Sequence, residues 1–199
     1  MILHFIGFYD YTVWLTYISL ASSLVGMVMA SRGSLKAAVL CLLISGFCDL
    51  FDGIVARTKK DRTQDQKNYG IQIDSLADVI AFGVLPAVIF YFHGVRSLLG
   101  IIILACYVLC GLIRLAFFNV LETKRQQDPT QSACVKEFRG MPITFSAIIT
   151  PIVCLVGWLL PQEISIYLYY IAPIVMAFLF VLDVKIPKLD VGKLLFGNK

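Results

Sequence analysis

The chain has 199 residues, of which 59% are hydrophobic and 15% are charged. A soluble globular domain has about 25% charged residues, so this composition excludes an ordinary soluble fold and predicts one integral membrane domain over residues 1–199. The net charge of +4 suits anionic lipid head groups and phosphates, and the small soluble surface argues against nucleic acid as a partner.

Six apolar segments are each long enough, at about 20 residues, to cross a bilayer. They predict an all-α, multi-pass protein with transmembrane helices at 11–30, 35–56, 71–92, 97–120, 141–160 and 164–184. The N-terminal stretch MILHFIGFYDY lacks the basic start of a secretory signal, and we expect it to lie along the membrane surface. Proline is expected to kink the third span at Pro86 and the fifth at Pro142 and Pro151.

The distribution of basic residues predicts the orientation of these spans. The two long polar loops, 57–70 and 121–140, fall on one side of the membrane together with both termini. Most of the 17 Lys and Arg residues lie on that side, and the exceptions are Arg32, Lys36 and Arg96. The excess of positive charge predicts that both termini and the long loops are cytoplasmic.

Four aspartates interrupt the apolar pattern on either side of the first long loop. Asp49 and Asp52 end the second span, and Asp74 and Asp78 begin the third. Spacings of three and four residues place both carboxylates of a pair on one helix face. An antiparallel pair of helices would bring all four to a similar depth near the cytoplasmic side.

Bare carboxylates at this density repel one another, and divalent cations would relieve the repulsion. Oxygen ligands without His or Cys favour Mg²⁺, Mn²⁺ or Ca²⁺ over Zn²⁺, and four carboxylates suffice for two metals. A cation or proton pathway is the rival interpretation, since intramembrane acids often mark one.

The same residues resemble the signature of the CDP-alcohol phosphotransferase family, D-x-x-D-G-x-x-A-R followed by G-x-x-x-D-x-x-x-D. Every fixed position of this signature is present in the chain: Asp49, Asp52, Gly53, Ala56, Arg57, Gly70, Asp74 and Asp78. Three further segments are similar to the phosphatidylserine synthase branch of the family: 73–87, 113–119 and 138–142. Phe117 stands where that branch usually has Arg, and Met141 replaces its Leu.

The resemblance implies a six-span enzyme, commonly a homodimer, whose active site opens to the cytoplasm. It implies transfer of the phosphatidyl group of CDP-diacylglycerol to the hydroxyl of L-serine, with release of CMP. Mg²⁺ or Mn²⁺ is the implied cofactor, as two divalent metals bound by the four aspartates, with Asp78 also the general base. Contacts with the CDP phosphates or cytidine are implied for Asp49, Gly53, Ala56, Arg57 and Gly70.

The acceptor site is less closely defined by the sequence. Arg114, Asn119 and Arg139 are polar residues near the cytoplasmic side, and we expect some of them to bind the serine carboxylate or a lipid phosphate. Glycerol 3-phosphate or an inositol phosphate remains an alternative acceptor, and an archaeal-type lipid an alternative donor. From another class, a cation-coupled transporter would carry acids near the bilayer midplane and show no nucleotide dependence.

Overall fold

A computed structural model describes residue 7 and residues 11–58, 61, 63–127, 137–183 and 185–187. Its helices are α1 (Trp14–Ser31), α2 (Leu35–Thr58), α3 (Gln64–Asp78), α4 (Leu85–Phe92), α5 (Leu98–Gln127), α6 (Ser146–Leu159) and α7 (Gln162–Val181). Shorter elements are η1 (Tyr11–Val13), the π-helical segment η2 (Val79–Val84), η4 (Ile143–Phe145), β1 (Glu137–Arg139) and β2 (Lys185–Pro187). The predicted interfacial segment before Tyr11 lies outside the described residues, apart from Gly7.

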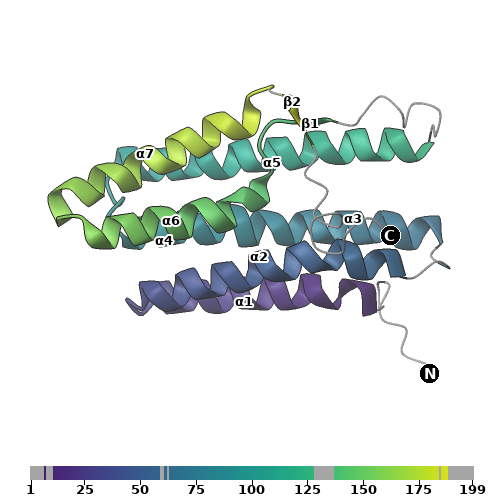
Figure 1. The fold of residues 1–199 in the computed structure, drawn as a ribbon, viewed down its shortest axis with the longest axis horizontal. Coiled ribbons are helices and arrows are strands. Elements are labelled where there is room, and N and C mark those ends of the chain that lie inside the picture. The colour runs from purple at the N-terminus through teal and green to yellow at the C-terminus, as the bar shows by residue number, and fades with distance from the viewer. Residues whose placement is uncertain are drawn as a thin grey trace.

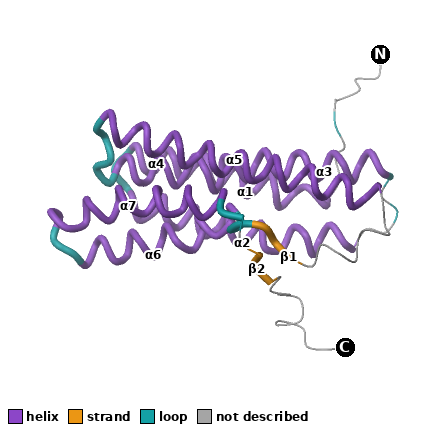
Figure 2. The backbone as a smooth tube through the Cα atoms, turned by 90° about the horizontal axis from the view of Figure 1, so that it is seen from above, coloured by secondary structure: helices purple, strands orange, loops and turns teal. Residues whose placement is uncertain are grey.

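The helices lie side by side in one elongated bundle (Figures 1 and 2). Because η2 joins α3 to α4 without a break, residues 64–92 form a single long helix. Among the described residues, five helices are long and apolar enough to cross a membrane, and Ile143–Leu159 is a shorter apolar helix. This arrangement confirms the predicted all-α, multi-pass class.

We call the end of the bundle where α2 ends and α3 begins the acidic end, since it carries the four aspartates. It lies to the right in Figure 1, and α6 and α7 stop short of it. The opposite end carries the short turns between α1 and α2, between α4 and α5, and between α6 and α7.

The predicted loop 57–70 is much shorter in the structure, because α2 continues to Thr58 and α3 already begins at Gln64. The side chain of Thr63 accepts a hydrogen bond from the Gln66 amide, and the Gln66 side chain accepts one from the Thr63 amide. This reciprocal cap stabilises a polar first turn that hydrophobicity alone assigns to a loop. Asp74 and Asp78 therefore lie well inside a helix rather than at its start.

The expectation for Pro142 needs correction. Pro142 does not kink the fifth span, because it is the N-cap residue of η4, which precedes α6. Pro151 does lie inside α6.

The two strands were not predicted: β1 and β2 pair antiparallel, with Phe138 opposite Ile186. Gly140 follows β1 with φ +73°, and a Cβ there would lie 2.8 Å from the Phe180 carbonyl oxygen. Only glycine fits this close approach to the end of α7.

Small and hydroxyl residues allow α1 and α2 to pack closely. Ser23 and Ser45 share a 2.9 Å hydrogen bond between their hydroxyls, and Ser22 donates to the Cys41 carbonyl at 2.9 Å. Hydrogen bonds of this kind join helices in a membrane, because lipid chains offer the hydroxyl groups no other hydrogen-bond partner.

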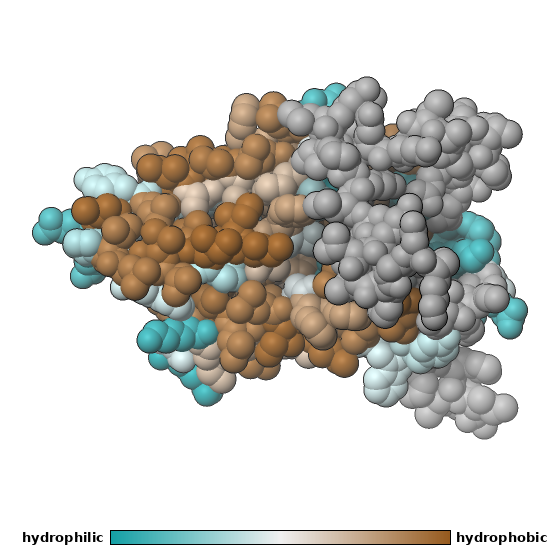
Figure 3. Space-filling model, viewed as in Figure 1, coloured by the Kyte–Doolittle hydropathy of each residue, from teal (hydrophilic) through white to brown (hydrophobic). Residues whose placement is uncertain are grey.

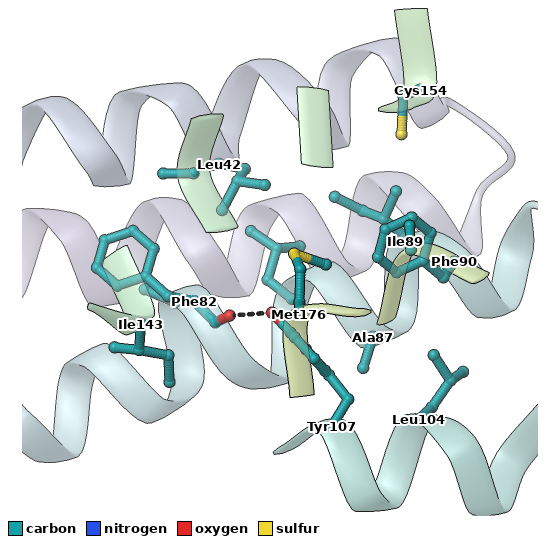
Figure 4. Packing of buried hydrophobic residues seen from close by; sticks show 14 of the residues in the cluster. Leu42, Phe82, Ala87, Ile89, Phe90, Leu104, Tyr107, Ile143, Cys154 and Met176 are labelled. Carbon is teal, nitrogen blue, oxygen red and sulfur yellow. Dashed lines mark hydrogen bonds between the residues drawn. The ribbon is translucent and has the colours of Figure 1, made fainter. Parts of the chain in front are cut away.

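Two further close contacts at glycines join α2 to α6 and α5 to η4. A Cβ on Gly46 would lie 2.7 Å from the Cβ of Ala147, and one on Gly111 would lie 2.6 Å from Ile143. Both glycines therefore permit a close approach that a larger side chain would prevent. Phe82 is fully buried here among the cluster drawn in Figure 4.

Apolar side chains also cover much of the outer surface of the helices, as Figure 3 shows for one face. Leu98, Leu159, Tyr167 and Phe178 are among the large side chains that are mostly exposed. Hydrophilic residues gather at the end opposite the acidic end, to the left in Figure 3. Because soluble monomers rarely expose apolar patches above a few hundred Å², this surface fits a lipid environment.

Candidate active site

The four aspartates come together in space from two neighbouring helices. One side-chain oxygen each from Asp49, Asp74 and Asp78 lies within 4.8 Å of the others. The carboxyls of Asp49 and Asp78 are within hydrogen-bonding reach of each other, and so are those of Asp52 and Asp74. Asp49, the first aspartate of α2, thus pairs with Asp78, the second aspartate of α3. Antiparallel helices produce this pairing.

The depth of the four carboxyls differs. Asp78 is 8% exposed, whereas Asp49, Asp52 and Asp74 are partly buried. Like charges this close repel each other and lose hydration. The cluster is therefore stable only if cations or shared protons offset its charge.

The spacing of the oxygens suits a divalent cation. Oxygens that bind Mg²⁺ at about 2.1 Å or Ca²⁺ at about 2.5 Å are separated by at most about 4–5 Å across the ion. The three oxygens within 4.8 Å match this range, and the donor set is entirely carboxylate. Asp49, Asp74 and Asp78 could hold one ion directly, and Asp52 extends the same cluster through Asp74.

Gly53 differs from the packing glycines. A Cβ built on it would meet no heavy atom of the described residues within 4 Å, and the residue is exposed. Packing therefore does not require glycine at this position, in contrast to Gly46, which lies about two turns earlier in the same helix. The open space lies one residue beyond Asp52, where a bound phosphate or nucleotide could approach the helix.

The other predicted phosphate-binding residues are only partly described. Gly70 lies in α3 and is partly buried. Ala56 and Arg57 belong to the last turns of α2, but their side chains lie outside the described part of the chain.

Helix α5 brings two of the three predicted acceptor residues toward the acids. Arg114 is 9% exposed, its guanidinium lies 5.3 Å from the centre of the Phe118 ring, and its charge acts on Asp78. Its Nε has no hydrogen-bond partner within the described residues. Asn119 accepts a 3.0 Å hydrogen bond from Ser75, which lies between Asp74 and Asp78 in sequence. Arg139 lies in β1 opposite Lys185, and its side chain is not described.

Sequence reasoning did not single out Ser75, Tyr107 or Ser146. Ser75 directly follows a predicted metal ligand, which could have marked it. Tyr107 and Ser146 both contact the Phe82 carbonyl, four residues before Pro86. A proline within a span signals that a freed carbonyl needs another partner, but the sequence does not say which group supplies it.

A family model and several curated relatives match this chain over most of its length. The family described as CDP-alcohol phosphatidyltransferase matches residues 12–184. The archaetidylserine synthase of Methanothermobacter thermautotrophicus is 32% identical over 181 residues, which cover 88% of this chain and 69% of that protein. A CDP-diacylglycerol–serine O-phosphatidyltransferase of Methanocaldococcus jannaschii is 31% identical over 173 residues, covering 86% of this chain and 72% of the relative. The Bacillus subtilis protein of the same name is 36% identical over 115 residues, 57% of each chain.

Proposed function

Since the chain belongs to the CDP-alcohol phosphatidyltransferase family, we propose that it transfers the phosphatidyl group of CDP-diacylglycerol to L-serine. The products are phosphatidylserine and CMP. The observation that carries this proposal is the convergence of Asp49, Asp74 and Asp78 beside the open space at Gly53. The names of the relatives support serine as the acceptor.

In this proposal Asp49, Asp52, Asp74 and Asp78 hold two divalent metals, Mg²⁺ or Mn²⁺. Bound there, the metals supply positive charge to the pyrophosphate of the donor and to the departing CMP. Arg57 contributes a further positive charge for a phosphate. Gly53, Ala56 and Gly70 leave room for the phosphates and the cytidine.

Asp78 is proposed as the general base. The serine hydroxyl loses its proton to a carboxylate oxygen of Asp78 as the hydroxyl oxygen bonds to the phosphatidyl phosphorus. The bond from that phosphorus to the bridging oxygen breaks, and the bridging oxygen leaves with CMP. The low exposure of Asp78 keeps competing water away from this carboxylate.

The acceptor is proposed to bind between α3 and α5. Arg114 offers the charge for the serine carboxylate, and its buried Nε has no hydrogen-bond partner among the described residues. Asn119, whose side-chain oxygen accepts from Ser75, offers its amide N–H groups to the acceptor. Arg139 is the third candidate, for the carboxylate or a lipid phosphate.

The basic residues of the long loops favour a cytoplasmic acidic end, with both termini on that side and access to membrane lipids. A homodimer also stays a prediction from the family resemblance. A cation-coupled transporter is disfavoured, since membership of a transferase family accounts for the aspartates.

The deciding experiment follows CMP release by the purified protein. CDP-diacylglycerol is incubated with L-serine, glycerol 3-phosphate and inositol phosphate in separate reactions containing Mn²⁺. Release that depends on L-serine is the expected result. Release with glycerol 3-phosphate alone would overturn the acceptor, and no CMP release with any alcohol would overturn the reaction.

A second candidate differs only in the donor lipid. The similarity to an archaetidylserine synthase favours an archaeal-type donor with isoprenoid ether chains. The same assay with the ether-linked CDP-lipid distinguishes the two, through the ratio of kcat/KM values for the two donors.

A further inference from the structure

The helix that carries Asp74 and Asp78 changes its hydrogen-bond pattern directly after Asp78. The π-helical segment η2 starts at Val79, and the Leu85 amide donates to the Ile80 carbonyl, five residues earlier. A π turn contains one more residue than an α turn, so η2 sets the rotation of the acid-bearing α3 relative to the apolar α4.

Pro86 leaves one carbonyl of this segment without its α-helical donor. Proline has no amide hydrogen and cannot donate to the carbonyl of Phe82, four residues before it. Two hydroxyls from other helices reach this oxygen instead. Tyr107 of α5 donates at 2.6 Å, drawn as a dashed line in Figure 4, and Ser146 of α6 lies at 2.7 Å.

Both hydroxyl residues are fully buried, so their hydroxyl groups need hydrogen-bond partners within the protein. Tyr107 and Ser146 are each 0% exposed, as is Phe82. The Ser146 hydroxyl also lies 2.7 Å from the Ile143 carbonyl, so its single proton is shared between two acceptors. The Tyr107 hydroxyl donates to the Phe82 carbonyl and also lies within hydrogen-bonding reach of the Ser146 hydroxyl.

Helix α2 also packs against the start of α6, next to the Phe82 carbonyl. Ala147, next to Ser146, contacts Gly46, and a Cβ on Gly46 would lie 4.0 Å from the Phe82 ring. Gly46 is three residues before Asp49, and Phe82 is four residues after Asp78. About one helical turn therefore separates this contact from the acid on each helix. The start of α6 thus contacts both acid-bearing helices.

We propose that Tyr107 and Ser146 are positioning residues: by binding the Phe82 carbonyl they hold η2 in its π conformation and set the placement of Asp78 against Asp49. The proposal rests on the proposed function, in which these two carboxylates serve phosphoryl transfer. Misplacement of a reacting group by about 1 Å can cost about 100-fold in rate. A contact one helical turn from Asp78 can therefore change the rate of transfer.

The test compares Tyr107→Phe with Tyr170→Phe. Each removes one phenolic hydroxyl and one hydrogen bond, since Tyr170 shares a 2.8 Å bond with Ser97 at the opposite end of the bundle. We expect Tyr107→Phe to lower kcat about tenfold with less than about twofold change in either KM. We expect Tyr170→Phe to leave kcat unchanged, whatever its effect on thermal stability.

A second readout needs no substrate. Mn²⁺ binding to the purified variants, followed by the electron paramagnetic resonance of free Mn²⁺, reports on the aspartates alone. We expect Tyr107→Phe to weaken Mn²⁺ binding several-fold and Tyr170→Phe to leave it unchanged. If serine proves not to be the acceptor, this result still stands, so failure of the proposed function is distinguishable from failure of this inference.

Ser146→Ala provides the test if Tyr107→Phe does not fold. Because Ser146 shares its proton with Ile143, we expect a smaller loss of kcat in the same direction, about threefold, again without a matching change in KM. A folded Tyr107→Phe or Ser146→Ala protein with wild-type kcat and wild-type Mn²⁺ affinity would show that these hydroxyls serve packing only, and would overturn the proposal.

Discussion

Ser75 donates a 3.0 Å hydrogen bond from its hydroxyl to the side-chain oxygen of Asn119. The bond joins α3, between its two aspartates, to α5, which also carries Arg114. The Asn119 oxygen is occupied by Ser75, which leaves the amide N–H groups to donate elsewhere. This geometry fits an acceptor site bounded by α3 and α5.

Ser75→Ala should therefore weaken acceptor binding more than it slows chemistry. The Asn119 amide loses the partner that fixes its orientation, and a hydrogen bond of this kind is worth about 0.5–1.5 kcal/mol, or roughly 2- to 13-fold in affinity. We expect the KM for L-serine to rise within that range while the KM for CDP-diacylglycerol stays constant. Ser22→Ala is the control, because it removes a hydrogen bond between α1 and α2. Equal KM values for L-serine in Ser75→Ala and wild type would contradict this role.

Asp78→Asn should remove nearly all activity and leave the fold intact. The amide fills the same volume but cannot accept the hydroxyl proton, and general base catalysis contributes about 10²- to 10⁴-fold. CMP release should therefore fall at least 100-fold. Asp65→Asn, an exposed change in the first turn of the same helix, should retain full activity. Near-normal turnover by Asp78→Asn would rule out the general-base role.

Removing divalent metal should abolish transfer, and adding it should stabilise the folded protein. Ligand at 100 times its Kd stabilises the native state by about 2.7 kcal/mol, which a thermal melt in detergent can detect. We expect chelator to stop CMP release and Mn²⁺ to restore it. Asp49→Asn and Asp74→Asn should each lose most of the Mn²⁺-induced rise in Tm. Full activity in excess chelator would exclude the metal site.

Gly140→Ala should destabilise the protein more than Gly33→Ala. Both glycines have positive φ values, +73° and +81°, so alanine adds a left-handed strain of about 1–2 kcal/mol at each. Only at Gly140 does the new Cβ also collide, at 2.8 Å from the Phe180 carbonyl oxygen, whereas Gly33 has open space. The difference between the two Tm values measures this collision. Equal Tm losses would mean that β1 can move away from α7 without cost.

His93, at the opposite end of the bundle, should make stability depend on pH. It stacks on Tyr169 with ring centres 4.3 Å apart, and burial lowers its pKa to about 4. In the unfolded chain its pKa is about 6.5, so the unfolded state binds the extra proton between these values. The contribution of neutral His93 is complete above pH 6.5 and is lost as the pH falls toward 4.

His93→Phe keeps the ring and removes the titration. We expect the Tm of the wild type to fall further than that of His93→Phe between pH 7.5 and pH 5. Titration of the aspartates affects both proteins alike, so the comparison isolates the imidazole. Parallel pH profiles would show that His93 is protonated as readily in the folded state as in the unfolded chain.

Much of the secondary structure could be predicted from sequence, because it depends on local pattern. The length of each apolar segment determined the spans, and spacing put each pair of aspartates on one helix face. The cap formed by Thr63 and Gln66 was also readable as a T-x-x-Q pattern, although hydrophobicity assigned those residues to a loop. The pairing of β1 with β2 was not readable, since each strand has three residues and its partner lies far away in sequence.

By itself the sequence determined that this is a membrane protein and that four acids share one region of it. Only the tertiary structure decided which acids meet, Asp49 with Asp78 and Asp52 with Asp74, and which hydroxyls reach the Phe82 carbonyl. The reason is physical: residue spacing fixes where side chains lie around one helix, whereas packing fixes how helices are rotated and how closely they approach. Gly46 against Ala147 and Gly111 against Ile143 set those distances here, and neither contact is visible in one helix alone.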